Sequence, residues 1–319
     1  MSKVVIPQTN RILFNVPVAP IQGTRFQPTG FPDLGAATYQ SGDKDCLLVE
    51  SAQSMANRLE LQIWDESKRD IKEELKGLPY IRVISSKDDN YLTSSITEAH
   101  RLNSPYILEG PDKTVLDIFT KEYPKGKDKE VRLINKQRFY EIVAKHDINS
   151  LLHGLFISKS DIAGGRLRIP RALSAFIEAE NIHTAASGGV KNDHINPSGD
   201  TGKGFGNVPF HREEFTSCDI MAYFSIDLEQ IHAYGLPEAV ERLIILLALY
   251  KIRSFVDGNM RLRTACDLAV KSGYEFSAAN DSSYNLPDLT SLTDDIKEAI
   301  AECQKINFFS GNDVITIKY

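Results

Sequence analysis

The sequence predicts a mixed fold of the α+β or α/β class, and three observations support this. Segments with strand composition and segments with helical periodicity alternate along the chain. The chain has 319 residues, enough for two domains of about 150 residues or for one large core with insertions. Its composition, 42% hydrophobic and 25% charged, is that of an ordinary globular protein.

The expected elements follow one another as short strands and helices. Residues 11–18 have the composition of a strand, with Pro17 at an end or an edge. Residues 51–64 predict a helix, because apolar side chains recur on one face and Ser51 suits the N-cap. Residues 237–256 predict a long buried helix that follows a proline. Further strands are expected at residues 46–49, 218–228 and 314–318, a strand or helix start at 261–270, and a short helix at 172–180.

Two segments stand out by composition. Residues 65–130 are unusually rich in charge and resemble an insertion. Balanced charge of this kind is typical of the solvated surface of helices and loops, and a partner-docking role is the alternative. Residues 187–206 are rich in glycine, which predicts a long loop or an open hairpin.

Charge and cysteine content limit the class of protein. A net charge of −6 argues against a coat protein that binds nucleic acid through a broad positive field, but it leaves room for a local basic groove. The four cysteines form no C-x-x-C pair, so we expect reduced thiols. The chain has no signal-peptide pattern and no apolar run of the ~20 residues that cross a bilayer, so we expect a cytoplasmic protein without a membrane segment.

The sequence holds no strong catalytic motif. Residues 199–204 lack the spacing of a phosphate loop, and H-E-x-x-H and G-x-S-x-G are absent. His183, His194 and His211 surround the glycine-rich segment, but their spacing specifies no zinc site. His153 lies in the apolar block of residues 150–158 (SLLHGLFIS), which favours a core histidine over a general base. We therefore expect no metal, no other cofactor and no catalytic centre.

Grouped arginines make a better case for binding a polyanion. Arg166, Arg168 and Arg171 follow a glycine pair, and alternation in this stretch puts the arginines on one side. Glycines let a backbone approach a phosphate, while guanidinium groups bind its oxygens in pairs. Pairing of these arginines with surface carboxylates such as Glu178 and Glu180 is an equally weighted alternative.

Five sequence blocks, taken together and in order, resemble one family. The blocks are residues 50–60 (ESAQSMANRLE), 164–176 (GGRLRIPRALSAF), 187–193 (SGGVKND), 206–215 (GNVPFHREEF) and 261–268 (RLRTACDL). They resemble the backbone subunit of type I-G CRISPR effector complexes, formerly called type I-U. That subunit is a member of the Cas seven group in the RAMP superfamily.

The resemblance implies an α+β fold shaped like a right hand. The palm is expected to be a modified ferredoxin-like, RRM-like RAMP fold, discontinuous over residues 11–64, 131–182 and 215–319. Residues 65–130 would be a finger-like insertion, and residues 183–214 a glycine-rich, thumb-like loop or hairpin.

The resemblance also implies a non-catalytic protein of antiviral defence. Such subunits polymerise head to tail along CRISPR guide RNA (crRNA) as a helical filament within a Cascade complex. The implied partners are the guide RNA, further copies of the chain, other effector subunits and the target DNA strand paired to the guide. One alternative is a RAMP-type ribonuclease that processes guide precursor or cuts target RNA, for which Asp33 and His153 are the positions to test. A protein-only scaffold is another.

The implied guide contacts are polar or basic side chains on several separate segments. They are Ser54, Asn57 and Arg58; Arg166, Arg168 and Arg171; Lys191, Asn192, His211 and Arg212; and Arg25.

Overall fold

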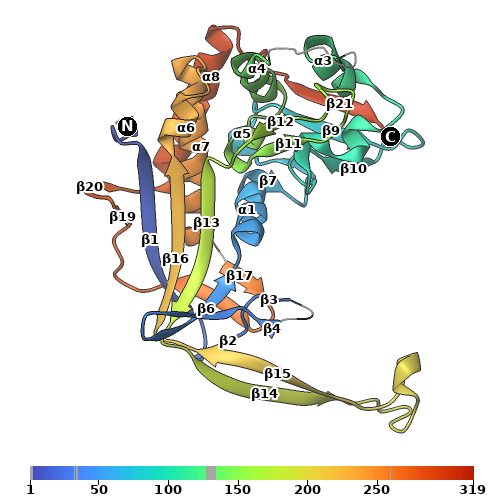
Figure 1. Ribbon diagram of the computed structural model, residues 1–319, viewed down its shortest axis with the longest axis vertical. Helices are drawn as coiled ribbons and strands as arrows, with labels where there is room; N and C mark the ends of the chain where they lie inside the picture. Colours follow the sequence, from blue (N-terminus) through green and yellow to red (C-terminus); the bar gives the residue numbers. More distant parts are fainter. Residues whose placement is uncertain (1–2, 32, 34, 127–133, 259) are drawn as a thin grey trace.

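The computed structural model describes residues 3–31, 33, 35–126, 134–258 and 260–319. Its centre is a curved seven-stranded antiparallel sheet with helices on one face. A lobe of short helices and strands lies beside the upper end of this sheet, and a long hairpin leaves its lower end (Figure 1). The predicted mixture of helices and strands in an α+β arrangement is confirmed.

The central sheet has the strand order β17-β18-β1-β16-β13-β6-β5, and each neighbouring pair is antiparallel. Its strands are β1 (Arg11–Pro20), β5 (Thr38–Ser41), β6 (Lys44–Glu50), β13 (Leu173–Glu180), β16 (Asp219–Asp227), β17 (Met260–Arg263) and β18 (Cys266–Val270). In β1 the residues Ile12, Phe14, Val16 and Val18 are buried and their neighbours are not, so one face of the sheet enters the core. The strands expected at residues 11–18, 46–49 and 218–228 are confirmed.

Helices cover the buried face of the sheet. They are α1 (Ala52–Glu60), α6 (Leu228–His232), α7 (Glu238–Asp257) and α8 (Leu289–Lys305). Ser51 caps α1 as predicted, because its hydroxyl accepts the Ser54 backbone N–H at 3.2 Å. α1 and α7 pack on the sheet and α8 packs on α7. None of the helices in the described part of the chain is long and apolar enough to cross a membrane.

The prediction of a helix at residues 172–180 is wrong, because this segment forms the strand β13. Its buried residues are Leu173, Ala175, Ile177 and Ala179, a period of two that fits a strand with one face in the core. Alanine and glutamate favour helices locally, but the hydrogen bonds that β16 offers along the whole of β13 override that preference.

The segment at residues 261–270 forms the hairpin β17–β18, so the strand alternative is confirmed. The chain then runs along the part of β1 that β18 leaves unpaired, where the backbone N–H of Ala279 donates to the carbonyl of Leu13 at 2.7 Å. This edge segment carries β19 (Ser277–Ala278) and β20 (Asp281–Asn285). It closes the edge without covering the face of the sheet opposite the helices.

The charged segment at residues 65–126 is a packed lobe, which differs from the expected solvated surface. The elements of this segment are β7 (Trp64–Asp65), β8 (Asp70–Ile71), β9 (Tyr80–Ile84), β10 (Tyr91–Ser94), α2 (Pro105–Leu108) and α3 (Thr114–Glu122). The chain continues with α4 (Lys136–Asp147), α5 (Asn149–His153), β11 (Leu155–Ile157) and β12 (Leu167–Ile169). Single-turn helices are η1 (Leu61–Ile63), η2 (Glu73–Leu75) and η3 (Arg101–Asn103). Ile81, Leu102 and Phe119 are completely buried, because the apolar residues between the charges collect into a core.

The last strand, β21 (Val314–Lys318), belongs to the lobe by its hydrogen bonds. It pairs in parallel with β9, which lies between β10 and β21. The strand expected at residues 314–318 is confirmed, although its partner was not predicted. The predicted domain boundary between residues 130 and 131 lies outside the described residues.

The glycine-rich segment is an open hairpin, one of the two predicted alternatives. β14 (His183–Lys191) and β15 (Val208–Thr216) pair over their whole length and form an arm that stands away from the body (Figure 1). The arm is anchored by β2 (Arg25–Phe26), which pairs with β15. The remaining elements nearby are β3 (Gly30–Phe31), β4 (Gly35–Ala36) and, at the arm tip, η4 (Thr201–Lys203).

Candidate nucleic-acid interface

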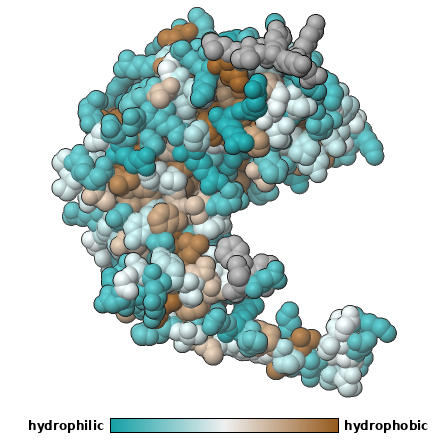
Figure 2. All heavy atoms as spheres, in the orientation of Figure 1, coloured by the Kyte–Doolittle hydropathy of each residue, from teal (hydrophilic) through white to brown (hydrophobic). Residues whose placement is uncertain are grey.

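A wide hollow separates the lobe from the arm on one side of the molecule (Figure 2). α1 and β17 lie between the lobe and the arm, and the β11–β12 hairpin lies above α1 (Figure 1). A groove of about 710 Å³ is formed by Gln53 of α1, residues of the 99–109 segment, and Phe156, Ser158 and Lys159 next to β11. Because several of the predicted RNA contacts lie on these elements, this side is the candidate interface.

Arg168 and Phe156 form an exposed cation–π pair on the β11–β12 hairpin. They are opposite one another in the register, and the guanidinium carbon lies 4.5 Å from the ring centroid. Phe156 is 46% exposed and lines the groove. Arg166 is also exposed, because Leu167 and Ile169 point into the core, so the predicted alternation is confirmed for these two arginines. An arginine beside an exposed ring can bind a phosphate while the ring stacks on a base.

The glycine pair before these arginines closes the turn of the hairpin. Gly164 and Gly165 have φ angles of +69° and +73°, which side chains rarely adopt. A Cβ atom on Gly165 would lie 2.5 Å from the carbonyl oxygen of Ser158. The glycines were expected to let the backbone approach a phosphate. In the structure, Gly165 instead lies close to the backbone of Ser158.

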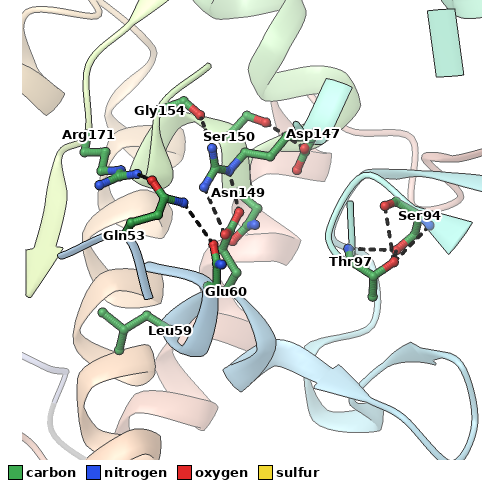
Figure 3. Close-up of polar contacts among 12 residues, drawn as sticks. Gln53, Leu59, Glu60, Ser94, Thr97, Asp147, Asn149, Ser150, Gly154 and Arg171 are labelled. Atoms are coloured by element: carbon green, nitrogen blue, oxygen red, sulfur yellow. Dashed lines mark hydrogen bonds and ion pairs between the residues drawn. The ribbon is translucent and has the colours of Figure 1, made fainter. Parts of the chain in front are cut away.

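Arg171 is linked to helix α1. Its guanidinium donates to the side-chain oxygen of Gln53 (Figure 3). Gln53 in turn donates to Asn57 at 3.3 Å. Burial and the nearby Arg101 charge lower the pKa of Arg171. Arg171 and Asn57, predicted on separate segments, thus share one network at the edge of the groove.

Ser54 and Arg58 are held by a carboxylate that sequence reasoning missed. Glu50 is completely buried, and its Oε1 accepts from the Ser54 hydroxyl and from Arg58 Nε, the latter at 3.0 Å. Arg263 forms an ion pair with the other oxygen. Arg58 also donates to the carbonyl oxygens of Arg261, at 3.4 Å, and Leu262, so it joins α1 to β17.

Burial lowers the pKa of both Arg58 and Arg263. Three of the guanidinium nitrogens of Arg58 already donate to protein oxygens. Its role in the folded chain is therefore to fix the position of α1. The only sequence signal for Glu50 is its place directly before the N-cap.

A buried polar cluster lies beneath the groove (Figure 3). Arg101 pairs with both carboxylate oxygens of Glu60, with Nη2 to Oε2 at 2.9 Å, and donates to the carbonyl of Gly154 at 3.1 Å. Lys251 of α7 donates to Asn149 of α5 at 2.5 Å. Burial lowers the pKa of Lys251 to about 7. This cluster ties α1, α5, α7 and η3 into one support for the groove.

The arm residues lie in a second region, away from the groove (Figure 1). His211 and Arg212 are in β15, opposite glycine and serine of β14, and Lys191 ends β14. The Arg212 guanidinium lies 5.2 Å from the ring centroid of Phe210, which is 38% exposed. Asn192 follows Lys191 in the connection to the tip. The arm thus repeats the pairing of an arginine with an exposed ring.

The arm tip is shaped by Asp193. Its carboxylate accepts the backbone N–H groups of Ile195 at 2.9 Å, Asn196 at 3.0 Å and Gly206 at 2.8 Å. These hydrogen bonds lower the pKa of Asp193, so the carboxylate is charged at neutral pH. These hydrogen bonds hold the tip in one closed turn structure, which was not predicted from the sequence.

Arg25 lies at the base of the arm, in β2. It forms an ion pair with Glu214 at 3.4 Å. Both residues line a separate cavity of about 450 Å³, together with Arg261 and Asp267, which pair at 3.6 Å. Arg25 is therefore brought close to the arm and not to the groove.

The two positions named for a ribonuclease differ in accessibility. His153 is completely buried, neither ring nitrogen has a hydrogen-bond partner within the described part of the chain, and burial lowers its pKa well below the ordinary value. It is therefore neutral and out of contact with any bound RNA. Asp33 is exposed. Over the described ranges, no group of three or more His, Cys, Asp and Glu side chains could hold a metal ion.

Comparisons with known proteins identify the family. The model of the family described as CRISPR-associated protein GSU0053 matches residues 12–184, more than half of the chain. No curated protein matches the sequence. A solved chain of a "CRISPR RNA-guided surveillance complex, pre-nicking" is similar with 13% identity and a TM-score of 0.41, over 81% of this chain and 73% of that one. On the family match, the chain belongs to the CRISPR-associated protein GSU0053 family.

Proposed function

We propose that this protein is a non-catalytic, crRNA-binding backbone subunit of a type I CRISPR effector complex of subtype I-G. The observation that carries the proposal is the exposed group Arg166, Arg168 and Phe156, beside a groove that Arg171 also lines. Membership of a CRISPR-associated family supports a role with guide RNA. The net charge of −6 fits a protein whose positive charge is confined to one side.

The groove suits an RNA backbone of any sequence. Arginines that bind phosphates carry no information about the bases, so the same surface accepts every guide. An exposed ring stacks on any base for the same reason. The second arginine-ring pair, Arg212 with Phe210, would let the arm contact the same strand at another point. Lys191, Asn192 and His211 would contribute from the same hairpin.

The strand order supports an RRM-like palm. Strands β1, β13, β16 and β18 follow one another in the chain and lie in the order fourth-first-third-second in the sheet. Helices α1 and α7 lie in the two connections that lead from the first to the second strand and from the third to the fourth. This order matches the β-α-β-β-α-β arrangement of ferredoxin-like folds, with β17 added at one edge and β6 and β5 at the other. The arm then connects the second and third strands, as a thumb would.

In this proposal the copies assemble head to tail along one guide. A head-to-tail contact uses two different surfaces of each copy, so it extends until the RNA ends. The guide bases that remain unpaired would then pair with a target DNA strand. The complex would act in antiviral defence in the cytoplasm.

Charge reversal at the groove tests the proposal. The chain is co-expressed with a CRISPR array, and the RNA that remains bound after purification is measured per protein. Arg166→Glu with Arg168→Glu should reduce the bound guide at least tenfold, because two phosphate contacts become repulsive. The control is Lys297→Glu with Lys305→Glu, which makes the same charge change on exposed positions of α8. Equal guide recovery in the two variants would refute the assignment.

A second assay tests the non-catalytic part. Purified protein is incubated with labelled guide precursor and with target RNA, with and without divalent metal. We expect intact RNA in every reaction. Cleavage that is lost in Asp33→Ala would overturn this part of the proposal and leave RNA binding as a separate question.

A further inference from the structure

The central sheet has an outer face, which points away from α1 and α7. The partly exposed positions of its strands lie there, alternating with the buried ones. In Figure 1 the strands β1, β16 and β13 lie in front of the helices, and Figure 2 shows apolar atoms over these strands. No helix of the described chain packs on this face.

Aromatic side chains gather on the outer face. Phe176 of β13 and Tyr223 of β16 are paired in register and stack with ring centroids 5.0 Å apart at 28°. Met221 precedes them on the same face, and Tyr39 of β5 is 40% exposed. We call Tyr39, Phe176, Met221 and Tyr223 the outer patch. A solvated sheet face is normally polar, whereas rings and methionine are enriched at protein interfaces.

Carboxylates border the outer patch. Glu178 follows Phe176 on the same side of β13, and Glu180 comes next. Burial and the nearby Glu178 carboxylate raise the pKa of Tyr39. Glu180 is already paired with Lys44. Among the residues described, no lysine or arginine forms an ion pair with Glu178.

Negative charge makes this face unsuitable for RNA. In an RNA-recognition fold the exposed rings of the sheet stack on bases. Here Glu178 lies next to Phe176 on the outer face, and Glu180 and Asp219 lie beyond it where the two strands meet at one end. They would repel the phosphates of a bound strand. The rings therefore suit a positively charged, planar group that is not attached to phosphates.

We propose that the outer patch binds an arginine side chain presented by another protein subunit of the complex. A guanidinium group stacks flat on an aromatic ring and simultaneously donates two hydrogen bonds to a carboxylate. Tyr223 and Phe176 offer the ring surface, and Glu178 offers the carboxylate. The inference rests on the proposed function in one respect, that the chain works within a complex of several proteins.

The test uses the complete complex, assembled from the chain, the other proteins of its effector and a CRISPR array. Each complex is purified through a tag on this chain, and native mass spectrometry gives its composition. Glu178→Gln and Tyr223→Leu should each lower the recovery of one other protein subunit at least tenfold. The number of guide RNAs and of copies of this chain should not change. L-arginine added to the wild-type complex should release that subunit at a lower concentration than L-lysine.

The control is Asp227→Asn, an acid-to-amide change at the opposite end of the same face, where Asp227 pairs with Arg11 and caps α6. It should leave the composition unchanged, and the thermal midpoint of each variant reports folding. A full set of subunits in both patch variants would overturn the proposal. Loss of guide RNA from the variants would assign the face to RNA binding. Fewer copies of this chain per guide would assign it to contact with a second copy. Either result would also overturn the proposal. Wild-type complex without RNA would refute the proposed function instead.

Discussion

Replacing Glu50 by glutamine should destabilise the fold far more than its small change in size suggests. The carboxylate is completely buried and pairs with Arg58 and Arg263. Removing one partner of a buried ion pair costs about 3–5 kcal/mol, because the remaining charge is left uncompensated. The two arginine side chains are 28% and 23% exposed, so water compensates part of this loss. We expect Glu50→Gln to lower the free energy of unfolding by about 2–4 kcal/mol.

An exposed ion pair of the same chain provides the control. Lys44 and Glu180 are paired on the sheet with side chains 46% and 41% exposed. Glu180→Gln makes the same chemical change, and pairs of this kind contribute at most about 1 kcal/mol. Urea unfolding followed by circular dichroism compares the two variants with the wild type. Equal losses for Glu50→Gln and Glu180→Gln would refute the reasoning, since burial would then have no effect on the pair.

Three further predictions concern single residues. Burial raises the pKa of Asp147 from 3.8 to about 6. Between these values the folded state holds a proton that the unfolded chain has released, so the stability falls as the pH rises from about 4 to about 6. Asp147→Asn should reduce this pH dependence of the thermal midpoint. Gly165→Ala should cost about 2–3 kcal/mol more than Gly273→Ala, because both have positive φ but only Gly165 lacks space for a Cβ. Asp193→Ala should speed amide exchange at the arm tip and leave exchange in β13 unchanged.

The sequence predicted the elements whose pattern is local. The strand composition of β1 and the N-cap of α1 depend on neighbours in the chain, and both elements were predicted correctly. β13 was not, because its alanines and glutamates favour a helix until β16 supplies hydrogen bonds on one side. The lobe core was missed for a related reason. Its apolar residues are spread thinly between charges and gather only in three dimensions.

The candidate site was predictable in composition but not in arrangement. Arg166 and Arg168 are exposed together as their spacing indicated. Phe156 was read as part of an apolar block, although its place between two buried residues of β11 marks it as exposed. Ser54 and Arg58 were expected at the surface and are held by Glu50, since a buried counter-charge is invisible to sequence periodicity. Contact between the predicted residues and RNA remains a prediction.

The parallel pairing of β21 with β9 has a consequence for synthesis of the protein. β9 covers residues 80–84 and β21 residues 314–318, so the lobe sheet cannot be completed until residue 318 has left the ribosome. Until then one edge of β9 lacks its hydrogen-bond partner, and unpaired edges of this kind invite association with other nascent chains. In the central sheet, β1 waits in the same way for β16 and β18, which come much later in the chain. Folding is therefore expected to begin at the β13–β16 pair, and the lobe sheet is expected to close only after β21 has been synthesised.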